Sequence, residues 1–283
     1  MSRALDYFRL TKPRLTLMAL ATAFTGFYMA HAGKLNLILF LNAALGSALV
    51  GGGANTLNQY LERFRDARMI RTQKRPLPDK RLGEKEAFGF GSFLSFAGIA
   101  ELWIFVNSLT AVIALITLLT YLFLYTPLKP KTILNTLVGA FSGAAPCLMG
   151  WAAAGGPLTL QAWALFLIVF VWQLPHFLAI AWVYREDYER AGFRMLPIRD
   201  PAGVYTSASV VAFTVLLFAV SLVPARIGMA GLTYLFMAVF GGIFLTGFAV
   251  YVALNKLAEV KKFIPLSIIY LFLLNVSLII DKT

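Results

Sequence analysis

The sequence predicts an all-α, polytopic membrane protein with nine transmembrane helices, and three observations carry this prediction. Hydrophobic residues make up 59% of the 283-residue chain and charged residues only 13%, which is more apolar surface than a soluble domain can bury. Apolar runs recur along the whole chain, each close to the ~20 residues that a helix needs to cross a bilayer. The basic residues gather in alternate loops between these runs.

The expected spans are helices because backbone groups in lipid must find their hydrogen-bond partners within the segment. The alternating apolar and polar strands of a membrane barrel are not seen in the sequence. Two of the intervening loops are long and polar, and both follow an even number of spans, so they face the same side. The nine spans cover residues 15–31, 36–58, 87–106, 109–126, 132–153, 160–184, 204–224, 229–254 and 263–280.

The charge distribution orients these spans. Of the 25 Lys and Arg residues, 22 lie before the first span or in loops after an even number of spans, and only Lys34, Arg226 and Lys282 lie on the other side. This asymmetry predicts a cytoplasmic N-terminus and an external C-terminus. The same asymmetry explains the net charge of +12, so the charge indicates the bilayer as the partner rather than nucleic acid. No transit peptide is recognisable, which makes the plasma membrane the expected location.

The end of the second span carries a stripe of oxygen-bearing side chains. Asn58, Glu62 and Asp66 are spaced by four residues, so on a helix they share one face over ~12 Å. Mg²⁺ is typically held by one or two carboxylates together with substrate phosphates, and Arg binds phosphate oxygens through its planar fork. A dense run of basic residues follows, including Arg71 and Arg75. The pattern therefore favours a Mg²⁺–diphosphate site.

A second interpretation of this stripe is a solvated helix end with local ion pairs. Glu62 with Arg65 and Asp66 with Arg63 have the spacing of such pairs. Acidic side chains next to a membrane-embedded helix are costly, however, and tend to be functional.

The end of the sixth span forms a second polar cluster on the same side. Gln173, His176, Tyr184 and Asp187 follow one another there, and Pro175 should kink the helix. His176 and Asp187 are eleven residues apart, which places them on one face of a continuous helix. His176 is either hydrogen-bonded within the bundle or functional, as a haem ligand, a contact to an acceptor or a proton carrier.

Several stretches resemble the UbiA-type intramembrane prenyltransferases. The stripe together with "RTQKRPLP" resembles the first signature of that superfamily, and "YTPLK" looks like its Tyr-x-x-x-Lys motif. The stretches "TKPRLTLM", "LNTLVGAFSGAAPCLMGW" and "WQLPHFLAIAWVYREDYERAGFRMLP" are similar to one branch, the protohaem IX farnesyltransferases. The similarity runs from Thr11 to about Pro197.

The resemblance implies one transmembrane prenyltransferase domain over residues 1–283, with nine helices around a central cavity. It implies Mg²⁺-dependent transfer of farnesyl from farnesyl diphosphate to a vinyl group of haem B, with water completing a hydroxyethylfarnesyl side chain. A haem A synthase or terminal oxidase assembly would act downstream. By motif position, the resemblance implies that the metal-binding and catalytic residues are Asn58, Glu62 and Asp66. The residues that it implies for contact with the diphosphate are Arg71, Arg75, Tyr125 and Lys129.

The second acidic motif of the superfamily is thinned here to Tyr-Arg-Glu-Asp at the end of the sixth span. Asp187 is therefore the one candidate for a second metal site, and the candidates for contact with the haem acceptor are His176, Gln173 and Tyr184. A prenyltransferase acting on a quinone precursor or an archaeal lipid alcohol is the alternative, and would favour a full second motif. A cation-coupled transporter is disfavoured because the acids lie at the internal mouths rather than at mid-membrane.

Overall fold

The structure is a computed structural model that describes residues 2–31, 33 and 35–282, so Lys34 lies outside the described residues. The described residues form helices, with one isolated β-bridge between Ala230 and Lys282, which confirms the all-α class. Each expected span is present as a helix or as consecutive helices. These are α2 (Pro13–Ala30), α3 (Leu37–Asp66), α4 (Glu84–Phe105), α5 (Ser108–Leu119) with η1 (Thr120–Tyr125) and α6 (Thr126–Leu128), α7 (Asn135–Ala153), α8 (Leu160–Val183), α11 (Val204–Ser221) with α12 (Val223–Arg226), α13 (Leu232–Leu254) and α14 (Val260–Ile280).

Eight of these helical segments are, within the described residues, long and apolar enough to cross a membrane. The other one, α2, has 18 residues and begins with Pro13 and Arg14, which lower its hydropathy. Proline is well placed there, because the first helical position has no intrahelical use for an N–H.

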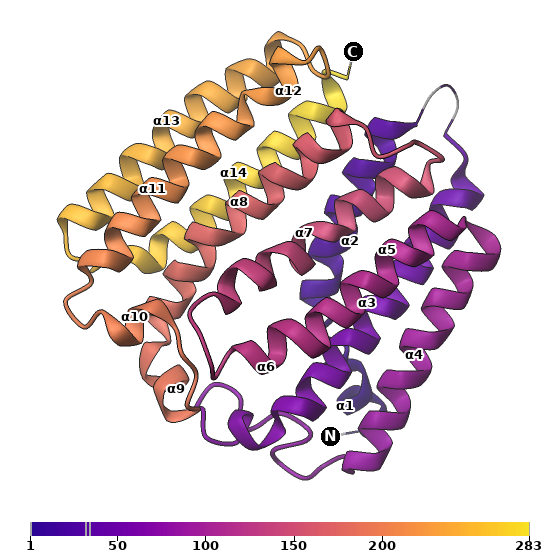
Figure 1. Ribbon diagram of the computed structural model, residues 1–283, viewed down its shortest axis with the longest axis vertical. Helices are drawn as coiled ribbons and strands as arrows, with labels where there is room; N and C mark the ends of the chain where they lie inside the picture. Colours follow the sequence, from indigo (N-terminus) through magenta and orange to yellow (C-terminus); the bar gives the residue numbers. More distant parts are fainter. Residues whose placement is uncertain (1, 32, 34, 283) are drawn as a thin grey trace.

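The two ends of the bundle differ. The chain begins at the end that holds the short helices α1 (Arg3–Leu10), α6 and α9 (Arg185–Arg190), and it finishes at the opposite end near α12 (Figure 1). Termini at opposite ends agree with an odd number of crossings. A further short helix, α10 (Leu196–Arg199), follows α9.

Helix α3 is longer than the span that the apolar pattern predicts, because it continues past Asn58 to Asp66. The oxygen-bearing stripe therefore lies on one uninterrupted helix. Close packing fixes α3 against α4: a Cβ added to Gly53 would come within 2.8 Å of the Gly91 carbonyl oxygen. Small residues that let backbones approach in this way are a common device for packing membrane helices.

The helices divide into an inner group and an outer group. Figure 1 shows α11, α13 and α14 on the side of α8 that faces away from α3, α4 and α5. A large core of buried apolar side chains joins these three outer helices to α8, with Leu217, Tyr234, Leu245 and Phe263 at most 1% exposed. The remaining membrane helices form the inner group, and a cavity lies among them.

Candidate functional site

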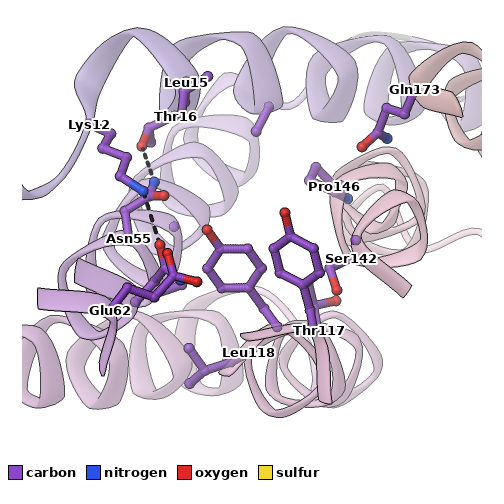
Figure 2. Close-up of a pocket in the computed structure, with 18 of the residues that line it drawn as sticks. Lys12, Leu15, Thr16, Asn55, Glu62, Thr117, Leu118, Ser142, Pro146 and Gln173 are labelled. Carbon is purple, nitrogen blue, oxygen red and sulfur yellow. Dashed lines mark hydrogen bonds between the residues drawn. The ribbon is translucent and has the colours of Figure 1, made fainter. Parts of the chain in front are cut away.

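A cavity of about 390 Å³ lies among α2, α3, η1, α7 and α8. Its lining brings together most of the side chains named from the sequence: Asn58, Glu62, Asp66, Arg71, Arg75, Tyr125, Lys129 and Gln173. Figure 2 shows Lys12 and Glu62 on one side of the cavity, with Gln173 and Pro146 on the opposite side. One end is therefore rich in charge, and the remainder is mostly apolar.

Each residue of the stripe is contacted by a cation from a different part of the chain. Lys12 Nζ donates to Asn58 Oδ1 over 3.1 Å, and Arg75 Nη1 donates to Asp66 Oδ2 over 2.7 Å. Lys129 Nζ lies 2.7 Å from Glu62 Oε1. The ion pairs with Arg63 and Arg65 that the spacing allowed are not the ones formed by these carboxylates.

The stripe has the donors that a hard divalent cation prefers. Glu62 Oε1 is buried, and Lys129 Nζ approaches it in an ion pair. Asn58 Nδ2 donates to Thr126 Oγ1 over 3.1 Å, and this bond turns Asn58 Oδ1 away from Thr126 toward Lys12. Oxygen ligands of this kind fit Mg²⁺.

These residues do not make a metal cage of their own. Among the described residues, no three His, Cys, Asp or Glu side chains come together as a metal-binding group. Two carboxylates and an amide leave room for phosphate oxygens and water, which is how Mg²⁺ is commonly bound beside a diphosphate.

Lys12 is a cavity residue that the sequence analysis did not single out. It precedes α2 with a left-handed backbone, at φ 48°. Burial, and then the charges of Arg75 and Lys129, lower the pKa of Lys12 to about 7. A bound anion would counteract the effect of these two charges and raise the pKa of Lys12. The available signal was a Lys-Pro pair at the start of a span, but pairing it with Asn58 requires knowing that α2 packs on α3.

Lys129 behaves differently, because its partner is a carboxylate. Burial lowers the pKa of Lys129, but Glu62, Tyr125 and Tyr121 together outweigh it, so the pKa lies above its ordinary value. Its ammonium also lies 4.5 Å from the centre of the Tyr125 ring. Lys129 therefore stays charged beside Glu62.

The π-helical segment η1 aims two aromatic rings at the cavity. Tyr121 and Tyr125 both line it, and their rings stack with centroids 5.4 Å apart. Gly139 makes room for this pair, since a Cβ there would lie 2.6 Å from Tyr125 Cε2. Tyr121 was missed from the sequence, although its position four residues before Tyr125 places both rings on one helix face.

Arg71 is held by residues from the second polar cluster. Asp187 accepts hydrogen bonds from the backbone N–H groups of Ile70 at 3.0 Å and Arg71 at 3.3 Å, and it pairs with Arg190. Burial raises the pKa of Asp187, but these partners outweigh it and lower the pKa. The Arg71 guanidinium lies 4.8 Å from the centre of the Tyr184 ring.

Three predicted residues are placed elsewhere than expected. Among the described residues, the cavity lining does not include Asp187, Tyr184 or His176. The expectation that His176 and Asp187 share a helix face is wrong, because α8 ends at Val183 and Tyr184, at ψ 24°, turns the chain into α9. Tyr188, which was given no role, does line the cavity.

His176 instead faces the outer helices. Its Nδ1 lies 2.8 Å from Ser267 Oγ on α14, and its ring stacks on Trp172 at 4.7 Å. Trp172 Nε1 donates to the Ser267 carbonyl over 2.6 Å. This geometry corresponds to the interpretation of His176 as a histidine hydrogen-bonded within the bundle.

Comparison with known proteins agrees with this architecture. Residues 19–276 match the UbiA prenyltransferase family. The chain is 42% identical over 287 residues to the protoheme IX farnesyltransferase of Solibacter usitatus (strain Ellin6076), covering 98% of both chains. It shares its fold with a digeranylgeranylglyceryl phosphate synthase (TM-score 0.82, 18% identity, covering 99% of both chains). It also shares it with a UbiA homolog from Archaeoglobus fulgidus bound to GPP and Mg²⁺ (TM-score 0.68, 16% identity, 97% and 99% covered). The chain is an integral membrane protein that belongs to the UbiA prenyltransferase family.

Proposed function

We propose that the protein transfers the farnesyl group of farnesyl diphosphate to a vinyl carbon of haem B, in a Mg²⁺-dependent reaction that takes up one water. The observation that carries this proposal is the charged end of the cavity, where Asn58, Glu62 and Asp66 are each contacted by a different cation. The adjoining apolar space suits an isoprenoid. The name of the Solibacter relative supports the choice of substrates.

The charged end would bind the leaving group. Asn58, Glu62 and Asp66 would hold Mg²⁺, which supplies positive charge against the diphosphate as the allylic C–O bond breaks. Lys12, Arg75 and Lys129 would exchange their carboxylate and amide partners for diphosphate oxygens, and their charge would stabilise the departing group. Asp187 and Tyr184 would not contact the substrate themselves but would position Arg71 at the cavity.

The apolar part would hold the farnesyl chain and limit access of water to it. The stacked faces of Tyr121 and Tyr125 offer electron density to the allylic cation as it forms. The vinyl π electrons of haem would then form the new C–C bond, which moves the positive charge to the carbon next to the porphyrin ring.

Mass spectrometry of the haem tests the proposal directly. Purified protein with farnesyl diphosphate, Mg²⁺ and haem B is expected to give haem heavier by one farnesyl group and one hydroxyl, and EDTA is expected to abolish this product. Transfer to a quinone precursor or a lipid alcohol in place of haem would overturn the acceptor. Absence of diphosphate release with every acceptor would overturn the enzyme and favour the transporter.

Lys12 offers a specific test of the diphosphate end. Lys12→Met should raise the KM for farnesyl diphosphate roughly tenfold, because it removes a charge-assisted contact with the anion. Steady-state diphosphate release measures this. Arg14→Met is the matched control, since Arg14 is exposed and does not line the cavity. Equal KM values for the two variants would remove Lys12 from the site.

Leu20 should limit the length of the isoprenoid. A second apolar cavity of about 140 Å³ lies between α2 and α3, and Leu20 and Ser47 line both cavities. Leu20→Ala should join the two spaces and improve the kcat/KM for geranylgeranyl diphosphate relative to farnesyl diphosphate by roughly tenfold. Leu17→Ala is the control, because Leu17 is 64% exposed on the same helix. An unchanged preference between the two diphosphates in Leu20→Ala would show that Leu20 does not limit the length of the isoprenoid.

We place the protein in the plasma membrane with its charged loops on the cytoplasmic side. The positive-inside distribution supports this orientation, and Figure 1 is consistent with termini on opposite sides. Farnesyl diphosphate would then enter from the cytoplasm. The product would pass to a downstream haem A synthase or terminal oxidase assembly.

A further inference from the structure

Gln173 presents an acceptor oxygen to the apolar side of the cavity. The residue is 3% exposed, yet it lines the cavity across from Lys12 and Glu62 (Figure 2). Gln173 Nε2 donates to the carbonyl oxygens of Ala140 and Val169, each over 3.3 Å. Because both neighbours are acceptors, only the nitrogen can face them, and Gln173 Oε1 is left toward the cavity.

Helix α7, which packs against α8, leaves space for this oxygen. A Cβ added to Gly143 on α7 would lie 2.1 Å from Gln173 Oε1 and 2.8 Å from its Cδ. Gly143 therefore leaves the space that the amide occupies. A polar group buried in an apolar wall is costly unless it has a partner, and among the described residues none donates a hydrogen bond to Gln173 Oε1, while its Nε2 is engaged by two carbonyl oxygens.

We infer that Gln173 positions the water that ends the reaction, an inference that rests on the proposed function. In the steps before, the C1–O bond of farnesyl diphosphate breaks, diphosphate leaves with the electron pair, and the vinyl π electrons then bond to C1 of the farnesyl cation. The cation left beside the porphyrin ring accepts a lone pair from water, a C–O bond forms, and one proton of that water passes to solvent water. Atoms and charge balance without any oxidant or reductant.

An acceptor is the right kind of group for this water. Gln173 Oε1 takes a hydrogen bond from the water O–H, so the lone pairs of the water oxygen stay free to attack. As the C–O bond forms, the water becomes a stronger donor, and the hydrogen bond to Gln173 strengthens in the transition state. Ser142, which Figure 2 shows on the same side of the cavity as Gln173, is a second polar group near this place.

The position also keeps this water away from the first cation. Gln173 lies across the cavity from the charged end, where the allylic C–O bond breaks (Figure 2). A water held there meets the cation only after the charge has moved onto the haem side chain. Without a positioned water, that cation would lose a proton from the neighbouring carbon and give an alkene, lighter than the alcohol by one water.

The product ratio tests this role. Gln173→Met is expected to raise the alkene-to-alcohol ratio of the farnesylated haem by roughly tenfold or more, measured by mass spectrometry. Gln173→Glu should keep the alcohol, because a protonated carboxyl can donate to one backbone carbonyl and present its other oxygen to the cavity. Gln161→Met, on the same helix but outside the cavity lining, should give the wild-type ratio.

Gly143→Ala gives the same test without altering Gln173, because the new Cβ displaces the amide; it should also favour the alkene. An unchanged ratio in both Gln173→Met and Gly143→Ala would overturn the inference. So would the loss of both haem products from variants that still bind Mg²⁺ and farnesyl diphosphate, since Gln173 would then act before the water. Wild-type protein that leaves haem unmodified would instead overturn the proposed function.

Discussion

Asp66→Asn is expected to lower the rate of diphosphate release by about a hundredfold or more at saturating Mg²⁺. Asp66 is 1% exposed, and its Oδ2 lies 2.7 Å from Arg75 Nη1. Asparagine keeps the shape and the oxygen that Arg75 contacts but removes the negative charge that attracts the metal. The loss should therefore appear in turnover rather than in folding, and diphosphate release measures it.

Asp79→Asn provides the comparison for this result. Asp79 lies in the same loop as Arg75, but its side chain is 52% exposed and pairs with Arg81. Turnover close to wild type is expected. Equal rates in the Asp66 and Asp79 variants, with both proteins folded, would exclude the stripe as the metal site.

Lys129→Met is expected to destabilise the protein, because it leaves the charge of Glu62 unpaired. It is also expected to abolish turnover, because it removes a cation that would stabilise the departing diphosphate. Lys129 and Glu62 form a buried ion pair, with side chains 11% and 5% exposed. Removing one partner of such a pair leaves an uncompensated charge, which typically costs about 3–5 kcal/mol. The melting temperature in detergent should therefore fall markedly.

The double variant Glu62→Gln/Lys129→Met separates the two effects. It removes both charges, so the melting temperature should return most of the way to the wild-type value, while diphosphate release stays lost. Melting temperatures that fall additively in the double variant would show that the two residues are not coupled. Recovery of turnover would contradict a role for either residue in catalysis.

Much of the fold follows from the apolar pattern alone. The nine expected spans match helices because the length of an apolar run is set by the bilayer. The apolar pattern ends the second span at Asn58, but the four-residue spacing of the stripe already treats Asn58–Asp66 as helix, and α3 does continue to Asp66. The division into inner and outer helices was not predictable from the same pattern, because lipid-facing and buried helices are similarly apolar.

The site was predictable where its residues share one helix or one motif. Asn58, Glu62 and Asp66 share a face by spacing, and the resemblance added Tyr125 and Lys129. Contacts between helices were harder. Lys12 meets Asn58 only because α2 packs on α3, and His176 faces α14 because α8 has partners on both sides.

The bond between His176 and Ser267 has a meaning beyond packing. Gln173 and His176 are less than one turn apart on α8, so any rotation of this helix about its axis moves both side chains together. Ser267 receives a hydrogen bond from Trp172 and contacts His176, and it thereby sets the angle at which α8 stands. None of the described residues of α11, α13 or α14 lines the cavity, yet through Ser267 helix α14 influences the direction in which the Gln173 oxygen points.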